Sequence, residues 1–147
     1  MKKPVIMTAR EACGHIRDGA VIVNTGMLLA ANAEAVLTAM EESFLQTRHP
    51  SGLTLMHSSS QSDRVGGIEH LAHPGMVDRM IGSHWGLAPK WMRCIADNEI
   101  CAYNIPQGQM THLLRSMACG EYGNVTKVGL GTFIDPRIEG GKMNEKA

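Results

Sequence analysis

Residues 20–24 (AVIVN) limit the possible folds more than any other short stretch of the chain. An uninterrupted apolar and β-branched run has no polar face, which is typical of a strand covered on both sides. Similar runs predict strands at residues 53–57 (LTLMH), 77–82 (VDRMIG) and 100–105. The last strand must stop at Pro106, because proline cannot donate to a sheet ladder.

Segments with helical spacing lie between and around these strands. Thr8 is expected to cap a first helix, with Glu11 completing a capping box and Asp18-Gly19 closing the helix. Asn32 is expected to cap a second helix that runs to about Thr47. The apolar residues expected to face inward are Val36, Leu37, Met40 and Phe44 in the second helix, Trp91, Met92 and Ile95 in a helix from Pro89 to about Asn98, and Met110, Leu113, Leu114 and Met117 in a helix opened by Gln107.

Alternation of strands and helices over 147 residues predicts one α/β domain covering residues 1–147. We expect a mainly parallel, open sheet with helices on both faces, because parallel strands need crossover connections. No internal repeat interrupts the alternation.

The composition excludes several classes of function. The formal net charge is zero and only 4% of residues are aromatic, which argues against a nucleic-acid partner. No apolar run is long enough for a membrane span. The seven histidines form no HExxH or comparable cluster, so no metal site is expected. Four cysteines without a CxxC pair, and no recognisable signal peptide, predict reduced and mostly buried thiols in a cytoplasmic protein.

Two strand-to-helix turns are candidate ligand sites. Gln107 follows a strand and precedes a helix, and ligands of open α/β sheets bind at the carboxyl ends of strands. Its amide both donates and accepts and does not titrate, which suits a carboxylate or carbonyl ligand; alternatively, Gln107 caps the helix. At Thr25-Gly26 the backbone can approach a bound group. With one glycine and no GxGxxG fingerprint, that turn has a purely structural alternative.

The remaining polar features have simpler interpretations. Residues 58–67 (SSSQSDRVGG) read as a solvated loop, although its serines could also bind phosphate. Trp85 is expected in the core or at a subunit contact. Glu34, Glu69 and Glu99 are expected to be isolated, solvated carboxylates.

Two motifs carry a resemblance to a known family. AYNIPQG at residues 102–108, followed by TKVGLGTFIDPRIEGGKMN at residues 126–144, resembles the N-terminal half of the family I coenzyme A transferases. The resemblance is to the single-chain acetate/propionate type and to the alpha subunit of the 3-oxoacid type. IRDGAVIVNTG at residues 16–26 and MIGSHWGLAPKWMRCIADNEICAYN at residues 80–104 extend it over nearly the whole chain.

The resemblance implies transfer of CoA between an acyl-CoA and a short-chain carboxylic acid by a ping-pong route. In this family a glutamate attacks the acyl-CoA thioester and carries CoA as an enzyme thioester. CoA is then a substrate, and no cofactor is required. Gln107, with Gly108 after it in the PQG motif, would line the substrate site, and Gly26 would mark the turn near CoA.

Two departures from the family pattern matter. The glycine- and phenylalanine-containing run expected after the first strand reads NTGMLLAAN here, so Met27 and Leu28 replace small or aromatic residues. The nucleophilic glutamate belongs to the family's C-terminal half, and no glutamate of this chain matches its motif. We therefore expect an incomplete N-terminal domain that forms a homo-oligomer or joins a complementary beta-type chain. The alternative is a non-catalytic acyl-CoA- or carboxylate-binding module, or an assembly module.

Overall fold

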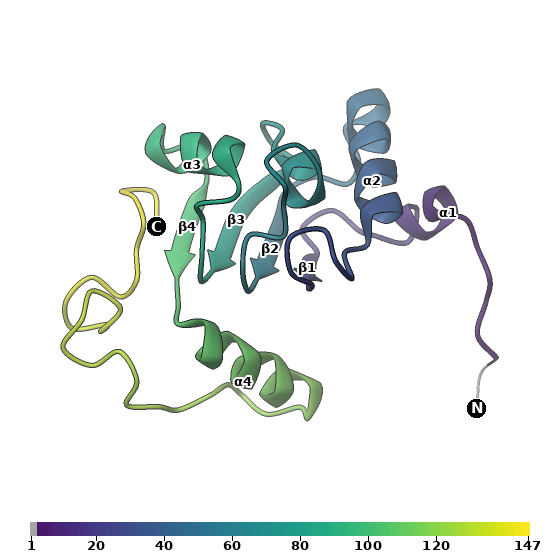
Figure 1. Cartoon of the computed structure of the whole chain (residues 1–147). Coiled ribbons are helices and arrows are strands. Elements are labelled where there is room, and N and C mark those ends of the chain that lie inside the picture. The colour runs from purple at the N-terminus through teal and green to yellow at the C-terminus, as the bar shows by residue number, and fades with distance from the viewer. Residues whose placement is uncertain (1–2) are drawn as a thin grey trace.

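The computed structural model describes residues 3–147 and contains a four-stranded parallel sheet (Figure 1). The strands are β1 (Val21–Asn24), β2 (Leu53–His57), β3 (Val77–Gly82) and β4 (Cys101–Asn104), in the spatial order β1-β2-β3-β4. All three strand pairs are parallel. The predicted α/β class, the parallel sheet and all four strand positions are confirmed.

The helical elements follow the predicted alternation. They are α1 (Ala9–Cys13), α2 (Glu34–Thr47), the short 3₁₀ helix η1 (Gly67–Leu71), α3 (Pro89–Ala96) and α4 (Gln107–Ala118). Thr8 and Glu11 form the expected capping box at the start of α1. The helix ends at Cys13, with Gly14 as its C-cap, rather than at Asp18-Gly19. After Cys13 the chain tightens into three-residue turns, in which the N–H of Ile16 donates to the Cys13 carbonyl.

The strand order determines where the crossover elements lie. When parallel strands follow one another in sequence, right-handed crossovers all fall on the same side of the sheet. Accordingly, α2, η1 and α3 share one apolar core with the sheet and lie together above it in Figure 1. Helices on both faces were expected, but within residues 3–147 the crossovers cover one face, and Val21 and Val23 on the other face are exposed.

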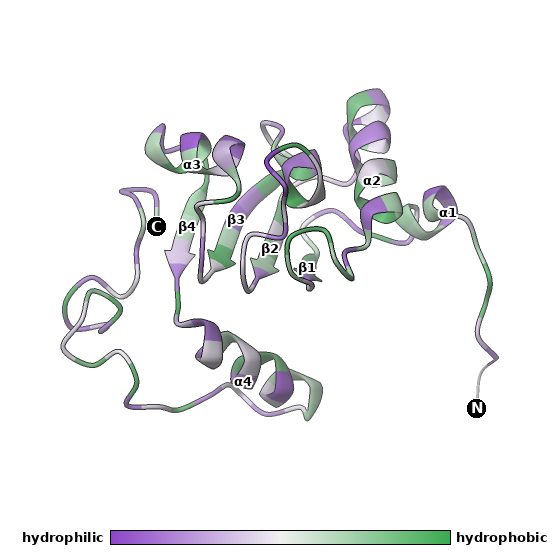
Figure 2. Ribbon diagram, in the orientation of Figure 1, coloured by the Kyte–Doolittle hydropathy of each residue, from purple (hydrophilic) through white to green (hydrophobic). Residues whose placement is uncertain are grey.

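The core is built on the central row of the sheet. Ile22, Leu55, Met80 and Ala102 are successive register partners, and the last three are fully buried. They pack with apolar side chains of the crossovers, among them Leu37, Met40 and Phe44 of α2, Ile68 and Leu71 of η1, and Trp91 and Ile95 of α3. Figure 2 shows green, hydrophobic residues in all four strands, together with hydrophilic residues within β3 and at the end of β4.

Three expectations about α2 and the later helices need correction. Asn32 does not cap α2; its side-chain amide donates to the Glu34 carboxylate, and the residue before the helix provides no side-chain cap. Met92 is exposed, because it lies one position from Trp91 and so points away from the core. In α4 only Met110 is fully buried and Met117 is exposed, since this helix lies beyond the strand ends rather than on the sheet (Figure 1).

The cysteines also differ from expectation. All four are free thiols, but only Cys13 is buried, and Cys119 is exposed. No helix in residues 3–147 is long and apolar enough to cross a membrane.

Residues beyond α4 form turns that return to the sheet. The N–H of Asn104 donates to the Gly141 carbonyl, and Tyr103 and Lys142 form an antiparallel bridge along the outer edge of β4. Asp135 accepts from the backbone N–H of Gly131 and from the Arg137 guanidinium, which holds the pKa of this carboxyl well below its usual range. Within residues 3–147 the opposite edge strand, β1, pairs only with β2.

Candidate functional site

Four turns meet at the carboxyl ends of the strands and surround a cavity of about 480 Å³, which we call the strand-end pocket. This volume lies within the range of ordinary small-molecule sites. Its lining comes from the turns after β1, β2 and β3 and from the start of α4, and consists of Gly26, Met27, Leu28, Ser59, Ser83, His84, Leu87 and Gln107. The arrowheads of the strands point toward α4 in Figure 1.

The segment 58–62 holds these turns together. The side-chain amide of Gln61 donates to the Gly26 carbonyl at 3.2 Å, and the Ser59 hydroxyl reaches the same carbonyl at 3.5 Å. The Ser60 hydroxyl donates to the His84 carbonyl, and the Ser83 hydroxyl donates to a carbonyl of the segment. This segment was expected to be solvated, but residues 60–62 are fully buried, and the side chains of Ser60 and Gln61 bond the turns on either side.

The turn after β1 depends on glycine. Gly26 has φ of 132°, and a Cβ there would lie 2.6 Å from the Ala30 carbonyl oxygen. The backbone N–H groups of Met27 and Ala30 each donate to the other residue's carbonyl, which closes the turn tightly. At its tip Leu28 adopts φ of 53°, a conformation that normally favours glycine.

A neutral histidine lies directly behind the pocket. His57, at the end of β2, is 1% exposed, and the backbone N–H of Ser60 donates to its Nδ1. The proton is therefore on Nε2, which lies against Gly82 and has no hydrogen-bond partner among the described residues. Burial, with a smaller contribution from nearby His84, lowers the pKa of His57 to about 4. Trp85 packs against its ring in a T-shaped contact, which confirms a core position for that tryptophan.

Gln107 is exposed at the pocket and is the first residue of α4. The helix has no side-chain cap, so the capping alternative for Gln107 is wrong. Within the part of the chain that the structure describes, its side-chain amide makes no hydrogen bond and so is available to a ligand. Gly108, next to it, lies outside the pocket lining, and a Cβ there would meet open space.

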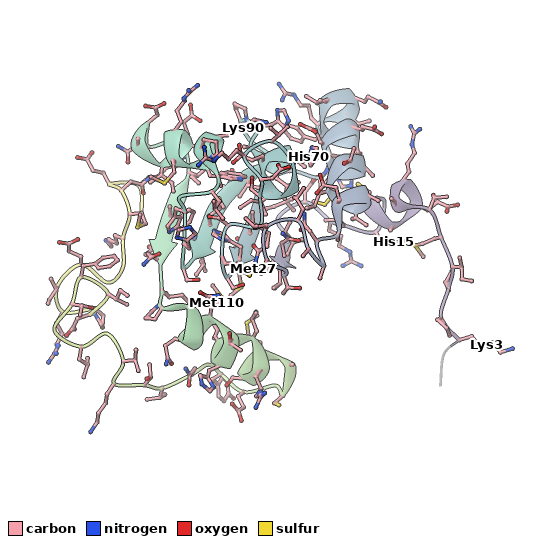
Figure 3. The ribbon with its side chains drawn as sticks, viewed as in Figure 1. Lys3, His15, Met27, His70, Lys90 and Met110 are labelled. Carbon is pink, nitrogen blue, oxygen red and sulfur yellow. The ribbon has the colours of Figure 1, made fainter. Side chains whose placement is uncertain are left out.

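Glu34 and Glu69 were expected to be solvated, but both carboxylates bond other parts of the chain. Glu34 and Glu41 of α2 both bond the His70 ring, at 2.9 and 2.5 Å, and Figure 3 labels His70 between α2 and α3. Burial alone would lower the pKa of His70, but bonds to the two carboxylates outweigh it and raise the pKa. Glu69 is fully buried and accepts the Lys90 backbone N–H at the start of α3; burial raises the pKa of its carboxyl. Glu99 is exposed, as expected.

The structure brings Gln107 and Gly26 to one pocket, although they are far apart in sequence and follow β4 and β1 respectively. Sequence reasoning missed Gln61, Ser83 and His84 as parts of this site. Their only sequence signal is their place shortly after strand ends, which many ordinary loop residues share.

An α/β domain with a pocket at the carboxyl ends of parallel strands has the architecture in which open α/β sheets bind their ligands. The chain also matches the coenzyme A transferase family model over residues 6–146. It therefore belongs to the coenzyme A transferase family, as its motifs predicted.

Individual relatives agree. The chain is 38% identical over 140 residues to the caffeate CoA-transferase of Acetobacterium woodii and 36% identical over 145 residues to the acetate CoA-transferase YdiF of Escherichia coli K12. Each match covers 95% of this chain but 27% of the relative. The crystal structure of the E. coli O157:H7 acyl-CoA transferase YdiF, a thioester complex with CoA, superposes with a TM-score of 0.88 at 34% identity, covering 96% of this chain and 28% of that one.

Proposed function

We propose that this chain forms the N-terminal part of an enzyme that moves CoA between an acyl-CoA and a short-chain carboxylic acid. The observation that carries the proposal is the unengaged Gln107 amide at the strand-end pocket. A neutral amide can donate to a carboxylate or to a thioester carbonyl without exchanging a proton with it. The relatives described as acetate and caffeate CoA-transferases indicate carboxylic acids as the acceptor class.

The proposed route is ping-pong. A glutamate carboxylate attacks the acyl-CoA thioester, CoA leaves as a thiolate, and the thiolate then attacks the activated glutamyl carbonyl and releases the first acid. A second carboxylate reverses these steps and takes CoA away. In this proposal the glutamate lies outside this chain, CoA is a substrate, and no further cofactor takes part. Gln107 orients the reacting carboxyl group, Gly108 follows it in the PQG motif, and Gly26 marks the turn near CoA.

The test is CoA transfer from acetyl-CoA to propionate, followed by chromatographic detection of propionyl-CoA. We expect no transfer by the chain alone, and transfer when a chain carrying the glutamate is supplied. Transfer by the purified chain alone would contradict the external glutamate. A partner-completed enzyme that keeps full activity with Gln107→Leu would contradict the role of Gln107; Gln109→Leu is the matched control.

A second candidate is a non-catalytic module that binds carboxylates or acyl-CoA, or serves assembly. The observation that favours assembly is a sheet face that the described residues leave uncovered: Val21 and Val23 are exposed on it, and the outer edge of β1 has no paired strand in residues 3–147. Under both candidates we propose a homo-oligomer or a complementary beta-type partner, and sedimentation showing a stable monomer would contradict it. The free thiols support a reducing, cytoplasmic location.

A further inference from the structure

We propose that the Met27–Leu28 turn is the acyl-selecting wall of the strand-end pocket, so that the site prefers carboxylic acids with an apolar chain to acetate. This inference rests on the proposed function, because it takes Gln107 as the group that receives the carboxylate. It adds the class of acid and the residues that select it.

The first observation is the apolar character of this turn. Met27 and Leu28 line the pocket, yet they are 71% and 45% exposed. Figure 2 shows the turn between β1 and α2 as a continuous hydrophobic stretch, and Figure 3 labels Met27 on the strand-end side of the sheet. Leu87 adds a third apolar side chain to the same lining. Apolar side chains that line a cavity gain free energy when a ligand removes them from water.

The second observation is the backbone conformation. Leu28 has φ of 53°, where glycine is favoured, and Gly26 before it has a φ that side chains rarely adopt. A leucine held in a left-handed conformation is a strained residue, and strain of this kind collects at ligand sites. The hydrogen bonds between Met27 and Ala30 and the bond from Gln61 to the Gly26 carbonyl keep the turn in this form.

The third observation is the distance between the apolar and polar ends of the pocket. The Leu28 turn follows β1 and Gln107 follows β4, which lie at opposite edges of the sheet. Three spacings between adjacent strands separate these edges, about 14 Å at ~4.8 Å per spacing. The side chains shorten this span, and an acetate methyl group next to Gln107 lies farther from Leu28 than the end of a longer acyl chain does. A chain of several carbons can contact both.

The polar residues fix the direction in which an acid would lie. Ser59, Ser83 and His84 come from the turns after β2 and β3, between the two ends. The Ser59 and Ser83 hydroxyls already donate to backbone carbonyls, so the side-chain donors left to a carboxylate are those of Gln107 and His84, whereas the side chains of Met27 and Leu28 are apolar. The hydrocarbon chain is directed toward Leu28.

The test measures binding of free acetate, butyrate and hexanoate to the chain by titration, without CoA. We expect affinity to rise toward hexanoate by up to about fourfold per methylene, the value for complete burial of each group. Leu28→Gly relieves the strained conformation and so should fold, and it is expected to remove the gain from butyrate to hexanoate. Leu29→Gly, in the same turn but outside the pocket lining, is the matched control and should keep the gain.

The outcomes separate this inference from the proposed function. Binding of all three acids with equal affinity, or an undiminished gain in Leu28→Gly, would overturn the selecting wall and leave a carboxylate site at Gln107. Failure of every acid to bind would overturn both. Pantetheine is measured in parallel: if Leu28→Gly weakens pantetheine and leaves hexanoate unchanged, the wall serves the CoA arm and the inference is wrong.

Discussion

Acid destabilisation through His57 follows directly from its burial. The ring has a pKa of about 4 in the folded chain against an ordinary value of 6.5. The unfolded chain therefore binds the proton more tightly, so stability contributed by neutral His57 is lost as the pH falls below 6.5 and is fully lost below 4. The difference corresponds to about 3 kcal/mol in total, of which about 2 kcal/mol is lost between pH 7 and pH 5.

The assay is urea unfolding of the wild type and of His57→Asn across this pH range. Asparagine keeps an acceptor near the position of Nδ1 for the Ser60 N–H and does not titrate. We expect the variant to be less stable at pH 7, because it loses the contact with Trp85, but to lose about 2 kcal/mol less than the wild type on going to pH 5. Other titrating groups cancel in this difference. Equal losses in the two proteins would refute a neutral, buried His57.

Two further substitutions test the pocket turn and its support. Gly26→Ala should lower the free energy of unfolding by about 2 kcal/mol, since the new Cβ meets the Ala30 carbonyl oxygen. Gly19→Ala is the control, because Gly19 is also at positive φ but in open space, and it should cost about 1 kcal/mol. Equal costs in denaturant unfolding would exclude the close contact at Gly26. Glu69→Ala should lower the free energy of unfolding by about 1 kcal/mol through loss of the α3 cap, while Glu69→Gln keeps an acceptor for Lys90 and should cost less. The opposite order would contradict the capping role.

The features predicted correctly are those encoded locally. The run 20–24 predicts a strand from its own residues, although the expected cover on both faces is wrong because Val21 and Val23 are exposed. Thr8 and Glu11 cap α1 through bonds between residues three apart. Pro106 ends β4 because no context restores its missing N–H. The α/β class and the family motifs were also predictable, because each can be read from residues that are close together in the sequence.

The expectations that failed depend on partners distant in sequence. Ser60 and Gln61 read as solvent-exposed because they are polar, but they are buried and bond turns more than twenty residues away. Glu69 is likewise buried, and its partner Lys90 belongs to the next helix. The position of the helices on one face follows from the strand order, which residue spacing does not encode.

The most direct test of the proposed site is the side-chain amide resonance of Gln107, followed by NMR during a titration with butyrate. We predict a saturable shift of this resonance. The amide of Gln109 is the internal control, because its carbonyl oxygen already accepts from Asn124 and it lies outside the pocket lining. A Gln107 resonance that stays fixed, or moves no more than that of Gln109, would contradict carboxylate binding at the strand ends.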